Sequence, residues 1–125
     1  MTADSAGRGL SPPDPQFCYV TTRGRVTGKP HEIEIWFARE PDASTIYLLS
    51  GGRDRSDWVK NIQADGAATV RIDGRTFDAT GRVVEPHTDE DALARRLLEE
   101  KYGHTQDLTR WLRESLPVAI DLSGQ

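Results

Sequence analysis

The segment ATVRIDGRTFDATGRVVE, residues 68–85, decides the fold. Residues 68–72 are rich in β-branched side chains, and the Asp73-Gly74 dipeptide that follows is typical of a two-residue hairpin turn. Phe77, Ala79 and Gly81 then alternate with polar residues, which is the period of a strand with one buried face. The segment therefore predicts two antiparallel strands, over residues 68–72 and 75–85.

Further strands are predicted on both sides of this hairpin. Residues 17–22 form a β-branched and aromatic run. Residues 31–37 (HEIEIWF) alternate strictly, with Ile33, Ile35 and Phe37 on one face. Residues 45–50 (TIYLLS) are apolar enough to be buried on both faces, and residues 117–122 (PVAIDL) predict a final strand. Two glycines and a proline mark residues 24–30 as a turn.

Helices are predicted between these strands. Ser56 is a suitable N-cap for a helix over residues 57–63, and Thr88 with Asp91 fits a capping box for a helix that runs to about Tyr102. A third, short helix is predicted over residues 106–114. The order β-β-β-α-β-β-α-α-β lacks βαβ alternation, so we expect a mainly β fold, a small antiparallel β-barrel with helices on its rim.

Length and composition exclude several classes of protein. The chain has 125 residues, which corresponds to one domain; residues 1–16 predict a disordered leader, and the barrel is expected over residues 17–125. A net charge of −4 argues against a nucleic-acid partner. The single cysteine, Cys18, excludes an internal disulfide, and no apolar run reaches the ~18 residues of a membrane span. We expect a soluble, cytoplasmic protein.

Two basic loops stand out from this acidic background. Arg23, Arg25 and Lys29 occur with no acidic residue among them, at or within the predicted turn. A second cluster, within residues 53–60, follows two glycines and opens a helix. Glycine-rich backbone, cations and a helix N-terminus all favour bound anions, so the two loops predict two anion-binding sites. The alternative interpretation is that these basic side chains are solvated residues of surface turns.

Other kinds of site fit poorly. The turn GRVTGK, residues 24–29, is not a nucleotide-hydrolysing P-loop, because three residues rather than four separate its glycines and Pro30 follows the lysine. On a strand, His31 lies on the opposite face from Glu32 and Glu34, so we expect no metal. No G-x-S-x-G elbow occurs, and a hydrolase nucleophile is therefore not expected.

Four motifs occur in order between residues 20 and 122. They are Thr21-Thr22-x-Gly24-Arg25-x-x-Gly28-x-Pro30, Ser50-Gly51-Gly52, Trp58-x-x-Asn61, and a closing stretch with Tyr102, Trp111 and Leu116-Pro117-Val118. This set resembles the deazaflavin-dependent nitroreductase family. The resemblance implies a split antiparallel β-barrel that binds coenzyme F420, a 5-deazaflavin with a phosphate and an oligoglutamate tail. It also implies hydride transfer from the reduced cofactor to quinones, nitro compounds or activated alkenes, chemistry that needs no protein nucleophile.

The resemblance assigns roles to individual residues. Those expected to bind the cofactor are Gly24, Arg25, Thr27, Gly28 and Lys29 at its phosphate and tail, Ser50, Gly51 and Gly52 along its ring and ribityl chain, and Trp58 and Asn61 beside it. Tyr102 is the expected catalytic residue, facing the substrate pocket and serving, besides solvent, as a source of the proton.

Departures from the family pattern leave alternatives open. Val26 stands where many relatives carry Lys, with Lys29 on the same turn as a substitute, and Thr105 and Leu108 replace tyrosines of relatives. FMN is the alternative cofactor, and a barrel that binds a cofactor without catalysis is the alternative function. The expected partner is a small-molecule electron acceptor, and the expected assembly is a monomer or homodimer.

Overall fold

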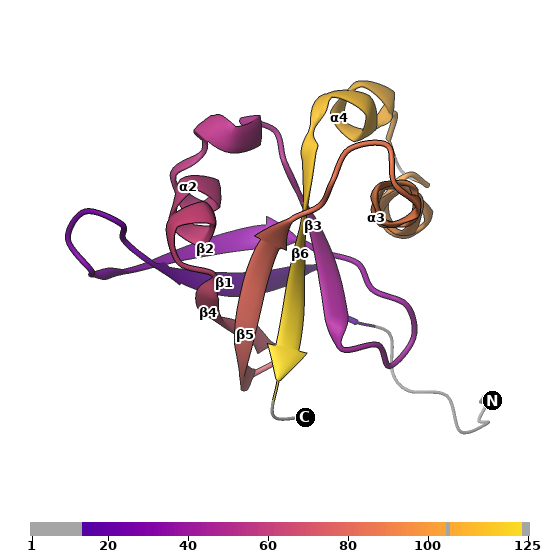
Figure 1. The fold of residues 1–125 in the computed structure, drawn as a ribbon. Coiled ribbons are helices and arrows are strands. Elements are labelled where there is room, and N and C mark those ends of the chain that lie inside the picture. Colours follow the sequence, from indigo (N-terminus) through magenta and orange to yellow (C-terminus); the bar gives the residue numbers. More distant parts are fainter. Residues whose placement is uncertain (1–13, 105, 124–125) are drawn as a thin grey trace.

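A single curled antiparallel sheet dominates the structure, a computed structural model that describes residues 14–104 and 106–123 (Figure 1). Its strands are β1 (Phe17–Arg23), β2 (Pro30–Trp36), β3 (Thr45–Ser50), β4 (Ala67–Ile72), β5 (Arg75–Val83) and β6 (Leu116–Ser123). The strand order is β2-β1-β4-β5-β6-β3, with every pair antiparallel. All six predicted strands are confirmed, with ends that differ by up to two residues.

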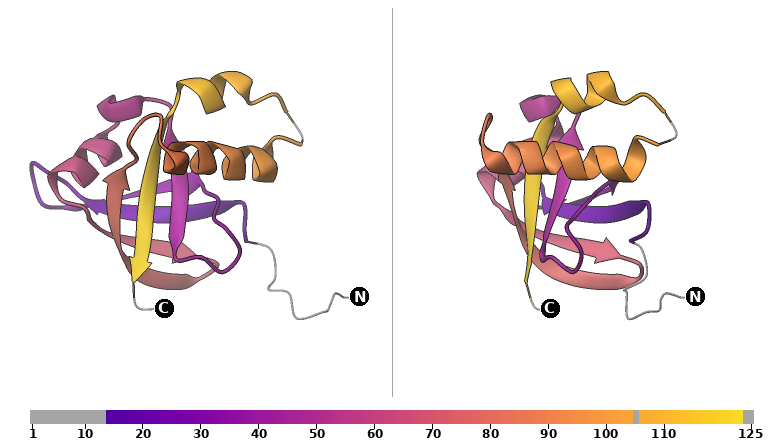
Figure 2. Two further views of the ribbon diagram at one scale, coloured as in Figure 1. Left: turned by 45° about the vertical axis from the view of Figure 1, so that its right-hand side comes forward. Right: turned by 90° about the vertical axis from the view of Figure 1, so that its right-hand side faces the viewer.

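The helices lie at two separate places on this sheet. A 3-10 turn, η1 (Arg53–Arg55), precedes α2 (Asp57–Ala64), and α2 packs against β1 and β5. The helices α3 (Asp89–Tyr102) and α4 (Thr109–Glu114) lie on the other side of the molecule, where α3 crosses β3 and β6 (Figure 2). The mainly β barrel with helices on its rim is therefore confirmed.

The prediction of the third helix was wrong at its start. Residues 106–108 precede α4 instead of forming its first turn. Asp107 accepts hydrogen bonds from the backbone N–H of Thr109, at 2.9 Å, and from its hydroxyl, at 2.6 Å. This local side-chain bond competes with helix formation, as Asp side chains do at helix starts.

The core has two parts that share strand β3. Ile46 and Leu48 point into the barrel, where they pack with Val20, Val70 and Ile120. The alternating residues Tyr47 and Leu49 point to the opposite face and pack under α3, against Ala94, Leu98 and Ala119 among others. Burial on both faces of residues 45–50, predicted from their apolar composition, is confirmed because α3 covers the outer face.

The first described residues are attached to the end of α3. Asp14 forms an ion pair with Arg39 at 2.9 Å, and the backbone carbonyls of Pro15 and Gln16 accept hydrogen bonds from Lys101 and Tyr102. The rest of the predicted leader, residues 1–13, lies outside the described residues.

Candidate functional site

The sheet does not close into a full barrel. Strands β2 and β3 are its two edges. An isolated bridge joins Ala38, which follows β2, to Tyr47 of β3. Next to that bridge, Trp36 of β2 and Leu49 of β3 line a pocket with Trp111 of α4, and η1 is bonded to α4 through Arg53 and Glu114. Edge strands carry backbone hydrogen-bonding groups that the sheet does not use, so the split is a natural place for a ligand.

One end of the split is formed by the β1–β2 turn, residues 24–29, and by Asp57 and Asn61 of α2; we call this the polar corner. Asn61 Oδ1 accepts hydrogen bonds from the backbone N–H of Arg25, at 3.2 Å, and from Arg25 Nη1, at 2.9 Å. Asn61 Nδ2 in turn donates to the hydroxyl of Thr22 at 3.1 Å. Asn61 is only 2% exposed, so a buried amide fixes the turn to the helix.

The cations of this corner are available to a ligand. Arg25 Nη2 lies 3.3 Å from Asp57 Oδ1, but the Asp57 side chain is 83% exposed and that of Arg25 is 32% exposed. Such an exposed pair contributes little stability, about 0–1 kcal/mol, and a better anion can replace the carboxylate. Lys29 has no ion-pair partner within residues 14–104 and 106–123.

The backbone geometry of the turn favours glycine at positions 24 and 28. The N–H of Gly24 donates to the carbonyl of Lys29, and the N–H of Gly28 donates to the carbonyl of Gly24, both at 2.8 Å. Gly28 has a φ of +75°, which other residues rarely adopt. A Cβ on Gly24 would lie 3.0 Å from the Lys29 carbonyl and 3.1 Å from the His31 ring. Thr27 supports the same turn, since its hydroxyl accepts from the N–H of Lys29 at 3.2 Å.

The loop after β3 connects the polar corner to α4. The buried hydroxyl of Ser50 donates to the carbonyl of Arg53 at 2.8 Å and lies 2.9 Å from the hydroxyl of Ser56. Ser56 is the N-cap of α2, as predicted, but its side chain makes no capping bond. Arg53 Nη1 donates to the carbonyl of Glu114, which holds the loop against α4.

The remaining predicted residues of this region have different surroundings. Gly51 and Gly52 are exposed, and a Cβ on Gly51 would meet open space. Trp58 is half-buried and packs against the barrel core. The loop glycines thus lie where a ligand could approach the backbone, while Trp58 supports the helix that carries Asn61.

The other end of the split is an aromatic pocket of about 400 Å³. Its lining residues are Phe17, Glu34, Ile35, Trp36, Leu49, Leu108 and Trp111. The ring centroids of Trp36 and Trp111 lie 5.5 Å apart at 87°, an edge-to-face pair that joins β2 to α4. Pockets of this size with mostly apolar walls are typical of small-molecule sites. The sequence did not lead us to predict this pocket. One sign of it was present, because Trp36 lies on the otherwise polar face of an alternating strand.

Tyr102 lies behind that pocket, away from the polar corner. Its ring stacks on Trp36, with centroids 4.2 Å apart and 5° between the planes. Its hydroxyl accepts from the N–H of Phe37 at 3.0 Å and lies 2.8 Å and 2.5 Å from the carbonyls of Phe37 and Gln16. Burial raises the pKa of Tyr102. Contact between Tyr102 and a substrate stays a prediction, and the hydroxyl reaches a substrate only after these bonds break.

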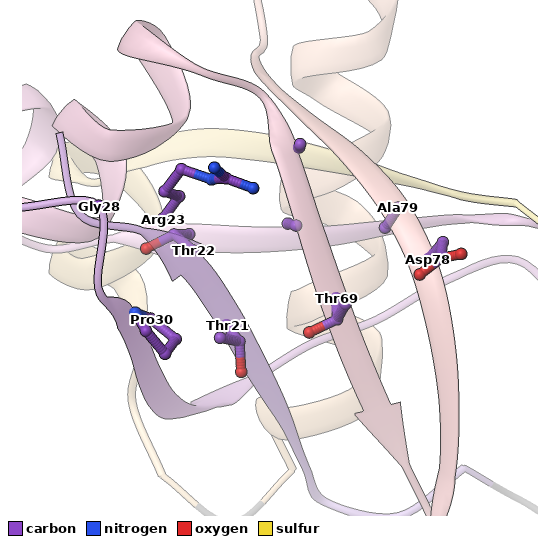
Figure 3. A pocket seen from close by; sticks show the side chains of 10 residues that line it. Thr21, Thr22, Arg23, Gly28, Pro30, Thr69, Asp78 and Ala79 are labelled. Atoms are coloured by element: carbon purple, nitrogen blue, oxygen red, sulfur yellow. The ribbon is translucent and has the colours of Figure 1, made fainter.

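A second hollow, of about 460 Å³, lies over β1, β4 and β5 (Figure 3). Thr21, Thr69 and Asp78, neighbours across the three strands, line it together with Arg23 and other residues near the β1–β2 turn. Of the predicted site residues it includes Gly28 alone, so it is separate from the split.

Within the described residues, no group of three or more His, Cys, Asp or Glu side chains is placed to hold a metal ion. No helix in the same part of the chain has the length and apolar character needed to cross a bilayer.

Comparison with known proteins shows the family of the chain. The family model of the F420H(2)-dependent quinone reductases matches residues 4–123. The chain belongs to this family. The predicted class of F420-dependent oxidoreductase, and coenzyme F420 as its cofactor, are therefore confirmed. The F420H(2)-dependent quinone reductase Rv1261c of Mycobacterium tuberculosis is 28% identical over 114 residues, which cover 87% of this chain and 74% of that protein.

Solved structures agree on the fold of this F420H(2)-dependent quinone reductase family member. A structure of the F420-H2-dependent reductase FDR-A has a TM-score of 0.69 at 21% identity, and the match covers 90% of this chain and 99% of that chain. A second structure, described as a domain-swapped dimer, also has a TM-score of 0.69 at 21% identity, covering 90% and 84% of the two chains. The split-barrel fold predicted for the chain is confirmed.

The residues around the split fit coenzyme F420. Its phosphate and carboxylates need accessible cations, and the polar corner presents Arg25 and Lys29 without a buried counter-charge. Its flat ring needs accessible backbone, which the loop at Gly51 presents beside the apolar pocket that Leu49 helps to line. The split thus combines the two chemistries that one elongated, partly charged ligand requires.

Proposed function

We propose that this chain reduces a planar quinone with F420H2, and that the split between β2 and β3 binds both molecules. The observation that carries the proposal is the arrangement along β2, which begins at the polar corner and ends at Trp36 in the aromatic pocket. A ligand lying along this strand would have its anionic tail at one end and its ring near the other. The quinone named for the family and for the mycobacterial relative supports the choice of acceptor.

In the proposed complex, the polar corner binds the acidic part of the cofactor. Arg25 would exchange its exposed partner Asp57 for the phosphate, and Lys29 would contact the tail carboxylates. Asn61 keeps the Arg25 backbone in place, because it accepts from the N–H of that residue as well as from its guanidinium. Gly24, Thr27 and Gly28 would contribute through the shape of the turn.

The loop after β3 and the aromatic pocket would position the reacting rings. Ser50, Gly51 and Gly52 would lie along the deazaflavin, with the glycines leaving room for close approach to the backbone. Trp58 would support this side through α2. When bound, reduced F420 supplies the hydride, so the chain's task is to hold the acceptor in the pocket lined by Trp36, Leu49 and Trp111 and to exclude water.

The role proposed for Tyr102 depends on whether its hydroxyl can leave its backbone partners. As a proton source it would have to release the carbonyl of Phe37 or of Gln16. As a positioning residue it would act through its ring, which fixes the plane of Trp36. A conservative Tyr102→Phe variant separates the two roles.

Two broader proposals concern setting and assembly. We propose a cytoplasmic protein, because Cys18 is a free buried thiol of the kind that reducing compartments maintain. We propose a monomer or homodimer, and the domain-swapped dimer among the structural neighbours is the observation in favour of the dimer. Sedimentation of the purified chain decides between the two assemblies.

The test of the function is a pair of ligand titrations followed by turnover. Oxidised F420 and FMN are titrated separately into the purified chain, with ligand fluorescence as the signal. We expect F420 to bind at micromolar concentration or tighter, FMN to bind more weakly, and F420H2 to be oxidised when a naphthoquinone is added. Preference for FMN, or binding of F420 without turnover of any quinone, would contradict the proposal.

A further inference from the structure

We propose that Glu34 is a specificity-determining residue that makes the aromatic pocket favour neutral planar acceptors over anionic ones. The inference rests on the proposed function, since it assumes that the acceptor occupies this pocket. It goes further by naming the charge class of the acceptor and the side chain that selects it.

Glu34 stands out among the pocket residues by its charge. Of the seven described residues that line the pocket, the other six have aromatic or aliphatic side chains. Glu34 lies two residues before Trp36 on β2, so the two side chains share one face of the strand. Glu34 and Trp36 therefore line the same pocket, so an acceptor held there would lie near the carboxylate.

The carboxylate is held in place without being neutralised. Tyr19, opposite Glu34 on β1, donates its hydroxyl to Glu34 Oε2 at 2.6 Å. The guanidinium of Arg71 stacks over the Tyr19 ring at 4.1 Å and pairs with Glu32 at 3.6 Å. Within the described residues, Glu34 has no Lys, Arg or His within salt-bridge distance.

A fixed negative charge next to apolar walls has a predictable effect on binding. Glu34 is exposed, so water screens part of its repulsion with an anionic substituent, but screening is weaker beside an apolar surface than in bulk solution. For groups in contact distance we expect a penalty of about tenfold in affinity. A neutral acceptor of the same shape meets no such penalty.

The experiment compares two probes that differ in one charge, 1,4-naphthoquinone and 1,4-naphthoquinone-2-sulfonate. Their dissociation constants are measured on the cofactor-free chain by quenching of tryptophan fluorescence, and kcat/KM is then measured with F420H2. Each probe is compared with itself across variants, so that the different reduction potentials of the two quinones cancel. The variants are Glu34→Gln, Glu34→Lys and a control, Glu100→Gln, which removes one exposed carboxylate from α3, outside the pocket.

We expect Glu34→Gln to tighten binding of the sulfonate by about tenfold and to change the neutral quinone by less than about twofold. Glu34→Lys should bind the sulfonate more tightly still, and Glu100→Gln should behave like the parent chain. Equal changes for the two probes, no change in Glu34→Gln, or no saturable binding of the neutral quinone would overturn the inference. If the parent chain does not bind F420, the proposed function is contradicted instead. The tryptophan-fluorescence titration of the two quinones would still test the role of Glu34.

Discussion

The two ends of the split are built in opposite ways. The polar corner is a surface turn whose charged groups face water, tied to the fold through one buried amide, Asn61. The aromatic pocket is built on rings in contact: the half-buried Trp36 and Trp111 meet edge to face, and the buried Tyr102 stacks behind Trp36. Substitutions at the corner should therefore change ligand binding with little effect on folding. Substitutions behind the pocket should change both.

The largest effect is expected from removing the guanidinium of the corner. Arg25→Ala should weaken F420 binding by about 10- to 100-fold, which corresponds to about 1.5–3 kcal/mol for a hydrogen bond to a charged group. The fold should tolerate the change, because Asn61 still accepts from the backbone N–H of residue 25. Fluorescence titration gives the dissociation constant, and a melting curve checks stability.

Arg23→Ala is the matched control for that substitution. Arg23 lies two residues earlier, is exposed, lines the second hollow, and reaches Asp65 only at 3.9 Å. Its removal takes the same charge from the same hairpin but should leave F420 affinity within about twofold, as for surface substitutions in general. Equal losses in the two variants would mean that the hairpin acts only through its overall charge, and the phosphate role of Arg25 would then be wrong.

Tyr102→Phe tests the opposite end, and its effect should be on stability. The change keeps the ring on Trp36 but leaves the buried N–H of Phe37 without its acceptor. We expect a loss of about 1–3 kcal/mol in the free energy of unfolding, measured in urea. Tyr47→Phe is the control; its hydroxyl donates to the carboxylate of Glu90, which keeps its bonds from Arg82, so the loss should be smaller.

The same Tyr102→Phe variant decides what the hydroxyl does in the reaction. A residue that delivers the proton typically accounts for a factor of about 10² to 10⁴ in kcat. A residue that only holds Trp36 in place should leave kcat within a few-fold and leave its pH profile unchanged. Unfolding and turnover measured on one preparation therefore distinguish the catalytic role from the positioning role.

A smaller effect is expected where α4 closes the pocket. Trp111→Leu keeps an apolar helix position but removes the edge-to-face partner of Trp36, an interaction worth about 0.5–1.5 kcal/mol. The KM for a naphthoquinone should rise by about 3- to 10-fold while the dissociation constant of F420 stays unchanged. A parallel loss of F420 affinity would show that the two ends of the split are not independent.

The fold was predictable because its signals are local. The Asp73-Gly74 turn and the alternation of Phe77 with Ala79 fix one hairpin, and the apolar run of β3 requires cover on both faces. The polar corner was partly predictable, since Arg25 and Asn61 belong to motifs that each point to a ligand. Their direct contact, across 36 positions of sequence, was not visible in either motif.

The aromatic pocket was not predictable by the same reasoning. Periodicity assigns Trp36 to a face of its strand but does not say which element covers that face. Here α4 brings Trp111 to it from 75 positions further along the chain. The attachment of Pro15 and Gln16 to α3 was missed for a similar reason, because it uses backbone carbonyls, which carry no signature of residue type.

The smallest effect concerns Lys101, which supports the wall behind the pocket. Its ammonium donates to the carbonyls of Pro15 and Phe37, at 2.9 and 2.7 Å, and lies 3.8 Å from the centroid of the Phe37 ring. Burial lowers the pKa of Lys101 to about 8 from an ordinary value of 10.5. Between these two values the unfolded chain binds more protons than the folded one, so rising pH favours the folded state through this residue. The cost of burying the charge is fully present below pH 8.

The contribution of Lys101 is isolated by comparison with Lys101→Met. The thiol of Cys18 acts in the opposite direction, because burial raises its pKa to about 12, and folding is then disfavoured once the unfolded thiol ionises above its ordinary value of 9.0. That contribution is common to both proteins and largely cancels. The free energy of unfolding of the parent chain, minus that of Lys101→Met, should therefore rise steadily between pH 7.5 and 9.5 in urea titrations. A difference that stays flat would mean that Lys101 keeps an ordinary pKa, and that the wall behind the pocket tolerates charge as readily as the polar corner does.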